Sequence, residues 1–166
     1  MLRALDVSNY FFSKDPERKI FNLCLINRND RSFYEGNAKI NKFLHLAQNL
    51  YIAKTGKALF SDDLYAYDNG AVALDILNRY PIIQKNIITS PDLGEFINDF
   101  LDRVFYLLKD ADVDELIELS HQDDEWIDKS RNYHKQEQKM HSLARAEEYA
   151  NQYEDALMVM YRMDMD

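Results

Sequence analysis

The sequence is poor in cysteine, glycine and proline. Its 166 residues include one Cys, four Gly and three Pro. A single thiol cannot form an internal disulfide and supplies too few ligands for a cysteine-based zinc site. So few turn-forming residues argue against a β-sandwich or barrel and favour long helices. Cys24 lies in the apolar run from Phe21 to Ile26, so we expect it to be a buried structural thiol.

The sequence also lacks the apolar stretches that membrane insertion requires. No run of about 18 apolar residues occurs, and the first residues do not combine a basic region with an apolar one, as a secretory signal does. We therefore expect a soluble, cytoplasmic protein. A chain of 166 residues is long enough to bury its own apolar core, so we expect residues 1–166 to form a single domain.

Basic residues are scarce in the last third of the chain. Residues 1–109 hold 14 Lys and Arg against 13 Asp and Glu, a net charge of +1. Residues 110–166 hold 6 against 16, a net charge of −10, which brings the whole chain to −9. This region lacks the clustered cations that bind phosphates, so direct nucleic-acid binding is not expected. It can attract a protein partner with a basic surface, or it can be a solvated surface without a partner.

Familiar catalytic motifs are absent too. There is no GxSxG nucleophile motif, and the four glycines are too far apart to cradle a phosphate or a dinucleotide. We therefore expect no catalytic residue, no metal site and no cofactor. A small metal-dependent hydrolase that uses His121 with the carboxylates of residues 123–125 is an alternative, because oxygen and imidazole ligands suit divalent ions. The same carboxylates are also explained by a helix that begins at Asp123.

Apolar residues at helical spacing predict a mostly α fold: a compact helical domain with a short strand or hairpin element and a long C-terminal helix. We expect a hairpin or irregular excursion within residues 20–37. Gly56 is expected to stop the second helix, and Ser90 to cap the fourth. The predicted helices span residues 4–12, 37–55, 70–80, 90–108 and 112–119, one that starts at Asp123, and a last one over about 134–161.

The segment from Leu64 to Val72 predicts a sharp turn. Leu64 to Tyr67 is expected to be extended, and Asn69-Gly70 takes positive φ angles at little cost, so that a strand can turn into a helix. Tyr67 would supply an aromatic side chain that packs over this turn.

Three stretches of the sequence resemble one known family. Residues 44–60 follow the pattern LxLAQxLYxAxTGKxLF, residues 4–10 read ALDVSNY, and Leu119-Ser120-His121 precedes Trp126. Together they resemble the Panacea, or SocA-like, antitoxin domain, which also occurs in phage-associated GepA proteins. The resemblance covers about residues 4–12 and 38–130. Tyr67 stands where the family has Trp, and family prolines are replaced at positions 71, 74 and 125.

The resemblance implies a protein-binding role without enzymatic activity. Panacea domains act as antitoxins that neutralise a partner toxin by direct contact, and SocA is an adaptor that delivers its toxin to a protease. The expected partner is a toxin encoded beside this gene, or a host protein if the gene is phage-borne. Six residues are expected to maintain the structure of the motif: Gly56, Tyr67, Gly70, Val72, His121 and Trp126.

The last predicted helix, which the resemblance does not cover, is the candidate for partner binding. Methionine side chains adapt to varied surfaces, and this helix is rich in them. It can equally pack on its own domain or form the seam of a homodimer. An acidic mimic of nucleic acid, which occupies the nucleic-acid groove of another protein, is a third functional alternative. The candidate partner-binding residues are Met140, Leu143, Tyr153, Leu157 and Met160.

Overall fold

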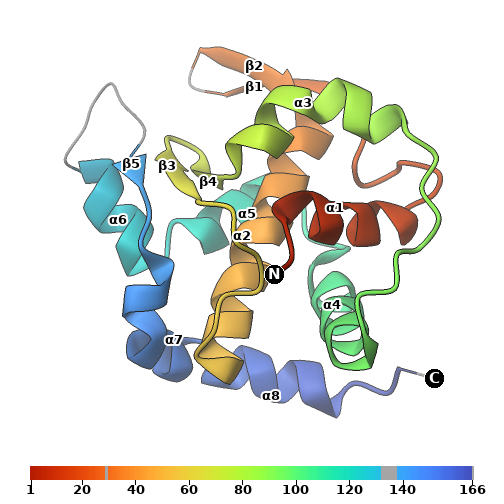
Figure 1. Ribbon diagram of the computed structural model, residues 1–166. Helices are drawn as coiled ribbons and strands as arrows, with labels where there is room; N and C mark the ends of the chain where they lie inside the picture. Colours follow the sequence, from red (N-terminus) through yellow and green to blue (C-terminus); the bar gives the residue numbers. More distant parts are fainter. Residues whose placement is uncertain (29, 132–137, 166) are drawn as a thin grey trace.

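One long helix, α2 (Glu35–Thr55), runs through the middle of the molecule (Figure 1). The computed structural model describes residues 1–28, 30–131 and 138–165. Each residue from Ile40 to Leu50 of α2 is buried, because other helices pack around it. These are α1 (Ala4–Ser13), α4 (Glu95–Leu108), α5 (Val113–Ser120) and α7 (Ala146–Gln152). The prediction of a mostly α fold is confirmed.

Gly56 ends α2 as the sequence predicts. Its φ angle is +72°, and its N–H donates to the carbonyl of Ile52 at 2.8 Å. Glycine adopts this left-handed conformation without the strain that a Cβ would add. Lys54 lies in the last turn, where a cation interacts favourably with the helix dipole.

Aromatic side chains fill the space between α2, α1 and α4. The Phe43 ring lies 5.4 Å from Phe11, 5.2 Å from Phe21 and 6.2 Å from Phe105 between ring centroids. The contacts of Phe11 and Phe21 with Phe43 are edge-to-face, which the ring quadrupoles favour.

Within the described residues, no helix combines the length and apolarity needed to cross a membrane.

Two small antiparallel sheets accompany the helices. β1 (Leu25–Arg28) and β2 (Arg31–Tyr34) form a hairpin, which confirms the hairpin expected within residues 20–37. The second sheet has the order β4-β3-β5, with β3 (Tyr65–Tyr67), β4 (Gly70–Val72) and β5 (Gln138–Lys139). The turn at Asn69-Gly70 therefore leads into a strand, and α3 (Leu74–Lys85) begins only after it. The expectation that this turn opens a helix is wrong.

Cys24 is exposed, which contradicts the prediction of a buried thiol. Of its apolar run only Phe21 is buried, where it contacts Phe43 and Phe12. After Phe21 the chain leaves the core toward the β1–β2 hairpin, which lies at one end of the molecule (Figure 1). An apolar run therefore did not identify which of its residues reach the core.

Helix α3 continues through Pro81 to Lys85, whereas the sequence predicts an end near Tyr80. Proline inside a helix leaves the carbonyl four residues earlier without its usual donor. That carbonyl belongs to Leu77, and the Asn37 side chain of α2 donates to it at 3.0 Å. A tertiary hydrogen bond thus lowers the cost of the proline.

The start of α4 differs from the prediction, while the start of α5 agrees with it. α4 begins at Glu95 rather than after Ser90, because Gly94 has a φ angle of +98° and Asp92 accepts a hydrogen bond from its N–H at 3.0 Å. α5 follows Asp112, whose carboxylate accepts from the Glu115 N–H at 2.8 Å. A capping box with reciprocal bonds of this kind is a strong start signal.

The prediction of a single long C-terminal helix is wrong. The described part of this region holds β5, a 3-10 turn (Ser142–Arg145), α7 and α8 (Glu154–Arg162), while His134 lies outside the described residues. The Met140 N–H donates to the Leu64 carbonyl, which extends the pairing of β5 with β3. At Tyr153, with φ −100° and ψ 11°, the chain turns from α7, which packs on α2, into α8, which packs on α4. Because β5 pairs with β3, and because α7 and α8 pack on different helices, this region does not form one straight helix.

Candidate functional site

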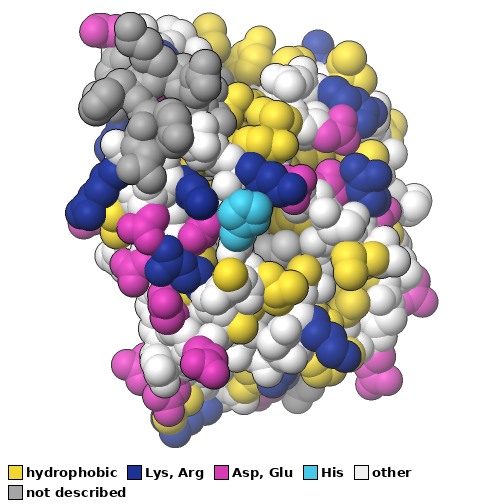
Figure 2. Space-filling view, turned by 60° about the vertical axis from the view of Figure 1, so that its left-hand side comes forward, with side chains coloured by type: hydrophobic (Ala, Val, Ile, Leu, Met, Phe, Trp, Pro, Cys, Tyr) yellow, Lys and Arg dark blue, Asp and Glu magenta, His cyan; other side chains and the backbone are white. Residues whose placement is uncertain are grey.

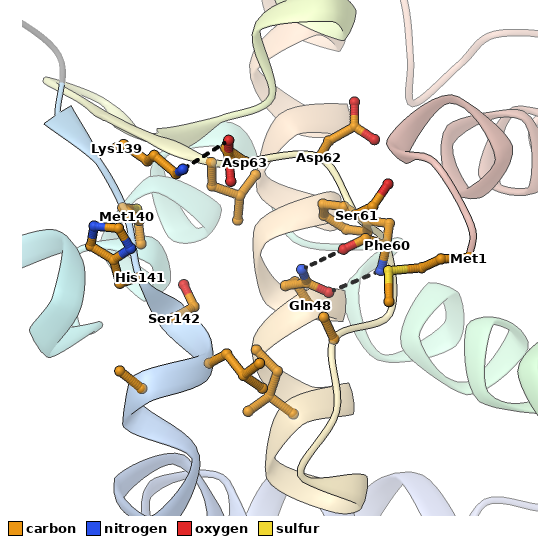
Figure 3. A pocket seen from close by; sticks show the side chains of 15 residues that line it. Met1, Gln48, Phe60, Ser61, Asp62, Asp63, Lys139, Met140, His141 and Ser142 are labelled. Atoms are coloured by element: carbon orange, nitrogen blue, oxygen red, sulfur yellow. Dashed lines mark hydrogen bonds and ion pairs between the residues drawn. The ribbon is translucent and has the colours of Figure 1, made fainter.

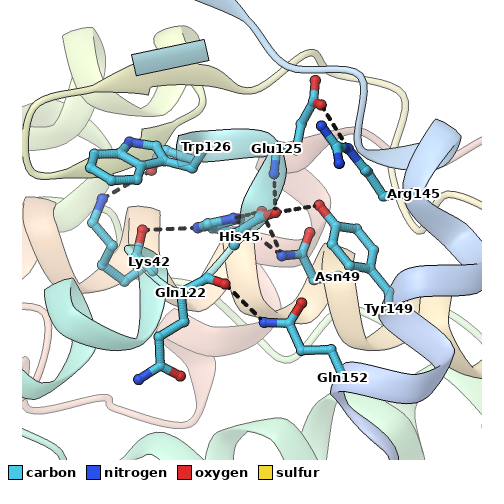
Figure 4. Close-up of polar contacts among 12 residues, drawn as sticks. Lys42, His45, Asn49, Gln122, Glu125, Trp126, Arg145, Tyr149 and Gln152 are labelled. Carbon is cyan, nitrogen blue, oxygen red and sulfur yellow. Dashed lines mark hydrogen bonds and ion pairs between the residues drawn. The ribbon is translucent and has the colours of Figure 1, made fainter. Parts of the chain in front are cut away.

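A buried polar cluster lies on the side of α2 that faces α5 and α7 (Figure 4). His45 and Asn49 are one helical turn apart, so they share this side. The His45 ring contacts Ser120 Oγ through Nδ1 at 3.0 Å and Asp123 Oδ2 through Nε2 at 2.6 Å. Four segments that are distant in the sequence therefore meet here: α2, the end of α5, the loop before α6 (Asp124–Arg131), and α7.

Asp123 is the centre of this cluster. Its carboxylate accepts hydrogen bonds from Asn49 Nδ2 at 2.8 Å, from the Tyr149 hydroxyl at 2.7 Å, and from the Glu125 N–H at 2.9 Å. Burial alone would raise the pKa of Asp123, but the bonds from His45, Tyr149 and Asn49 lower it to about 2. Asp123 is therefore ionised at neutral pH, and its bond to Glu125 also caps α6.

Ser120, His45 and Asp123 contact one another in the same sequence as the Ser-His-Asp triad of hydrolases, but unlike such a triad they are not accessible to solvent. An ionised carboxylate only accepts, so His45 Nε2 donates to Asp123, while Nδ1 lies within hydrogen-bond distance of the Ser120 hydroxyl. All three residues are 0% exposed. The Ser120 hydroxyl is therefore closed off from solvent, and the cluster connects α2, α5 and the loop before α6.

A second buried carboxylate, that of Glu125, binds the C-terminal segment (residues 138–165). The buried Glu125 accepts from the His141 N–H at 2.6 Å and from Arg145 Nε at 3.1 Å. Arg145 also pairs with Asp128 and Glu148, which raise the pKa of its guanidinium. The C-terminal segment is thus held to α6 by charge-assisted hydrogen bonds.

The predicted metal ligands do not converge. Asp123 and Glu125 are engaged as described, and His121 lies elsewhere, stacked on the Trp126 ring with centroids 4.0 Å apart. Its Nε2 donates to the Asp68 carbonyl at 3.2 Å, and burial lowers the pKa of the ring. Within the described residues, no three His, Cys, Asp or Glu side chains are placed to hold a metal ion.

Four of the six predicted motif residues lie together at the turn between β3 and β4. Trp126 Nε1 donates to the Tyr67 carbonyl at 2.8 Å, and His121 covers the same turn. Gly70 has a φ angle of +113°, and a Cβ there would lie 2.2 Å from Ser120 Oγ. The positive φ angle and the lack of space for a Cβ both require glycine at position 70.

Of the other two motif residues, one adjoins that group and one lies far from it. Val72 is buried in β4, opposite Tyr65 of β3, and so belongs to the same small sheet. Gly56 stands at the far end of α2, where a Cβ would meet nothing within 4 Å. Gly56 is therefore required for its backbone conformation and Gly70 also for space.

An open groove lies between α2, the segment 58–64 and the start of the C-terminal segment (Figure 3). Its volume is about 620 Å³. Lys139 pairs with Asp63 across one end at 3.3 Å. Gln48 of α2 is fixed in the groove by its bonds to the backbone of residues 59 and 60. Apolar lining comes from Met1, Ile52, Ala58, Phe60, Leu64, Met140, Leu143 and Ala144.

The five predicted partner-binding residues have different surroundings. Met140 and Met160 are buried, at 4% and 0% exposure, and Tyr153 and Leu157 are partly buried against the core. Leu143 is 52% exposed and lines the groove, as Met140 does. The structure thus brings two of the five together at the groove, and a role in binding stays a prediction for all five.

Several residues of the polar cluster were not identified from the sequence. His45 and Asn49 lie four apart on α2, which also buries Asn41, Lys42 and Gln48, and polar residues at this spacing in a buried helix give a local signal for a polar cluster. Tyr149 and Arg145 give none, because their partners lie 26 and 20 residues away in the chain.

Comparison with known proteins agrees with these observations. Residues 40–127 match the family described as the antitoxin SocA-like, Panacea domain. No curated protein and no solved structure matches the chain. The matched region is more than half of the 166 residues and contains most of α2, the turn at Gly70 and the loop at Asp123. The chain therefore belongs to the family of SocA-like antitoxins with a Panacea domain.

Proposed function

We propose that this protein is the antitoxin of a toxin–antitoxin pair and that it neutralises its partner by direct contact, without catalysis. Family membership is the observation that carries the proposal. The partner is a toxin encoded by a neighbouring gene, or a host protein if the gene is phage-borne. The Ser120–His45–Asp123 arrangement adds support for a role without catalysis, because its serine is buried.

The groove beside α2 is our candidate for the contact surface. Specific interfaces centre on apolar side chains that fill a complementary hollow, surrounded by polar groups. The groove has this composition: apolar walls that include Leu143, with Asp63, Lys139 and His141 around them. The bonds of Glu125 to the His141 N–H and of Asp123 to the Tyr149 hydroxyl fix the wall of the groove that carries Leu143. A fixed wall loses less entropy on binding.

Charge favours a partner with a basic surface. The last third of the chain has a net charge of −10, as counted above for residues 110–166. Figure 2 turns the α6–α7 side of the molecule forward and shows Asp and Glu side chains gathered there, with Lys and Arg among them. Such a surface speeds the encounter with a cationic protein, most strongly at low salt.

The C-terminal segment and the matched region are proposed to form one Panacea-like domain over residues 1–166. Tyr149 and Arg145 of this segment bond to Asp123 and Glu125 of the matched region. Removal of the segment would take these donors from both carboxylates and expose the side of α2 on which α7 packs, which is unfavourable.

Co-expression with the product of the adjacent gene tests the function. We expect a complex in pull-down and rescue of growth from the toxic product. Leu143→Asp should weaken the complex, because it places a charge in the groove. Leu25→Asp is the matched control, since Leu25 is more exposed than Leu143 and lies on the β1–β2 hairpin. Absence of a complex and of rescue would contradict the function, while equal binding by both variants would contradict only the groove.

A further inference from the structure

A second cavity lies on another side of the molecule, between the two hairpins and α2. Its volume is about 200 Å³. The turn from Tyr67 to Gly70 forms one wall and residues 31–33 of β2 form the opposite one. Arg31 and Asp68 pair at 3.4 Å between these walls, and both side chains are more than half exposed, so the pair lies at the rim. Apolar surface comes from Phe33, Ala38, Val72 and Leu77.

The cavity is lined by a buried lysine that has no carboxylate partner. Lys42 is 2% exposed, and its amine donates to the Ala71 carbonyl at 2.9 Å (Figure 4). In the described part of the chain, no ion pair includes Lys42. Burial lowers the pKa of its amine to about 7. A buried ammonium without a counter-ion is costly, and an anion in the cavity would remove that cost.

A second polar group of the cavity also has no partner. The Oδ1 atom of Asn69 is buried and makes no hydrogen bond within the described residues. The two ends of an amide have nearly the same shape, so a rotated Asn69 would present an N–H donor at this position. Asn41, by contrast, is bonded at both ends, to Asn37 and to the Ala73 N–H. The Lys42 amine uses one of its three N–H donors on Ala71, so Lys42 and the Asn69 amide both keep hydrogen-bonding capacity for a ligand.

We propose that this cavity binds a small monocarboxylate with a compact apolar body. The carboxylate pairs with the Lys42 amine and accepts from the Asn69 amide. The apolar body packs against Phe33, Val72 and Leu77. This apolar lining favours a hydrocarbon or aromatic group and disfavours a fully hydrated anion. This proposal does not depend on the antitoxin role.

Titration of the intact protein with benzoate tests the site, with NMR detection of the Lys42 side chain. We expect saturable shifts of its Cε–Hε signals with a Kd of about 1 mM or lower, as suits a small fragment. Benzyl alcohol, which has the same ring without the charge, and inorganic phosphate, which lacks the ring, should bind at least about tenfold more weakly. Equal binding of either compound, or no saturable shift with benzoate, would overturn the proposal.

Two variants locate the binding. Lys42→Met should weaken benzoate at least about tenfold, whereas Lys57→Met, at an exposed position outside the cavity, should leave the Kd unchanged. Ala38→Leu keeps the lysine but fills part of the cavity, so it should also abolish the shifts, and it answers the question if Lys42→Met does not fold. Unchanged affinity in Ala38→Leu, or in a folded Lys42→Met, would overturn the assignment to this cavity.

Discussion

The two sides of α2 hold the protein together in different ways. Toward α1 and α4 the helix presents Phe43, which contacts the rings of Phe11, Phe21 and Phe105. Toward α5 and α7 it presents His45 and Asn49, which join a network of directed hydrogen bonds. Both sides are fully buried, so burial alone does not distinguish them.

The difference separates stability from specificity. Apolar packing depends on area and volume and tolerates many arrangements of similar size. A buried polar network contributes little net stability when complete, but any arrangement that leaves its charge unpaired is strongly penalised. We infer that the aromatic side supplies most of the stability, while the polar side fixes where the C-terminal segment lies. That segment carries Leu143 and one wall of the candidate groove.

Removal of the central ring should produce the largest loss. Phe43→Ala leaves a cavity among three other rings, and we expect the free energy of unfolding to fall by about 3–5 kcal/mol. Chemical denaturation measures this loss. Phe96→Ala is the control, because Phe96 is about half exposed, and it should cost less than about 1 kcal/mol. Similar losses in the two variants would show that the aromatic side does not provide most of the stability.

Neutralisation of the central carboxylate should be the next largest effect. Asp123→Asn keeps the shape but removes the charge that His45, Asn49 and Tyr149 solvate, for a loss of roughly 2–3 kcal/mol in the free energy of unfolding. Asp124→Asn, one residue further on and exposed, should change it by less than about 0.5 kcal/mol. If both substitutions had the same small effect, the network would not constrain the fold.

The same carboxylate should make the polar side sensitive to acid. The folded-state pKa of Asp123, about 2, lies below 3.8, the ordinary pKa of an aspartate side chain. The stabilisation is therefore complete above about pH 4 and is lost as the pH falls toward 2, a change of roughly 2 kcal/mol. Urea unfolding at a series of pH values should show the wild type losing its advantage over Asp123→Asn in this window. Parallel curves would contradict the lowered pKa.

The sequence predicted the aromatic side better than the polar side. Helical spacing of apolar residues located α1 and α2, and Gly56 marked the end of α2, because these features depend on neighbours a few residues away. The spacing of Val113, Leu116 and Ile117 did the same for α5. Pro81 and Ser90 gave wrong boundaries, since Asn37 and Asp92 supply the hydrogen bonds that decide them.

The polar side could not be predicted because its bonds connect distant segments. A helical pattern with Met140, Leu143, Tyr153 and Met160 suggested one straight helix, but it does not contain the pairing of β5 with β3 or the acceptor at Asp123. The motif residues His121 and Trp126 were identified by resemblance, yet their contact with the turn at Gly70 is visible only in three dimensions. Patterns along the chain locate helices and their ends, and leave open which of the buried polar residues are bonded to one another.

The smallest expected effect is the one that best separates the two sides of α2. Tyr149→Phe removes one hydrogen bond to Asp123 and no apolar contact, so the free energy of unfolding should fall by only about 1 kcal/mol. The loss should be local: amide hydrogen exchange should accelerate in α7 and the 3-10 turn before it, and remain unchanged in α1 and α4. Tyr106→Phe, at an exposed ring on α4, should alter neither region. A uniform acceleration over all helices would show that the C-terminal segment opens only with the whole protein, and the polar side would then contribute to global stability as the aromatic side does.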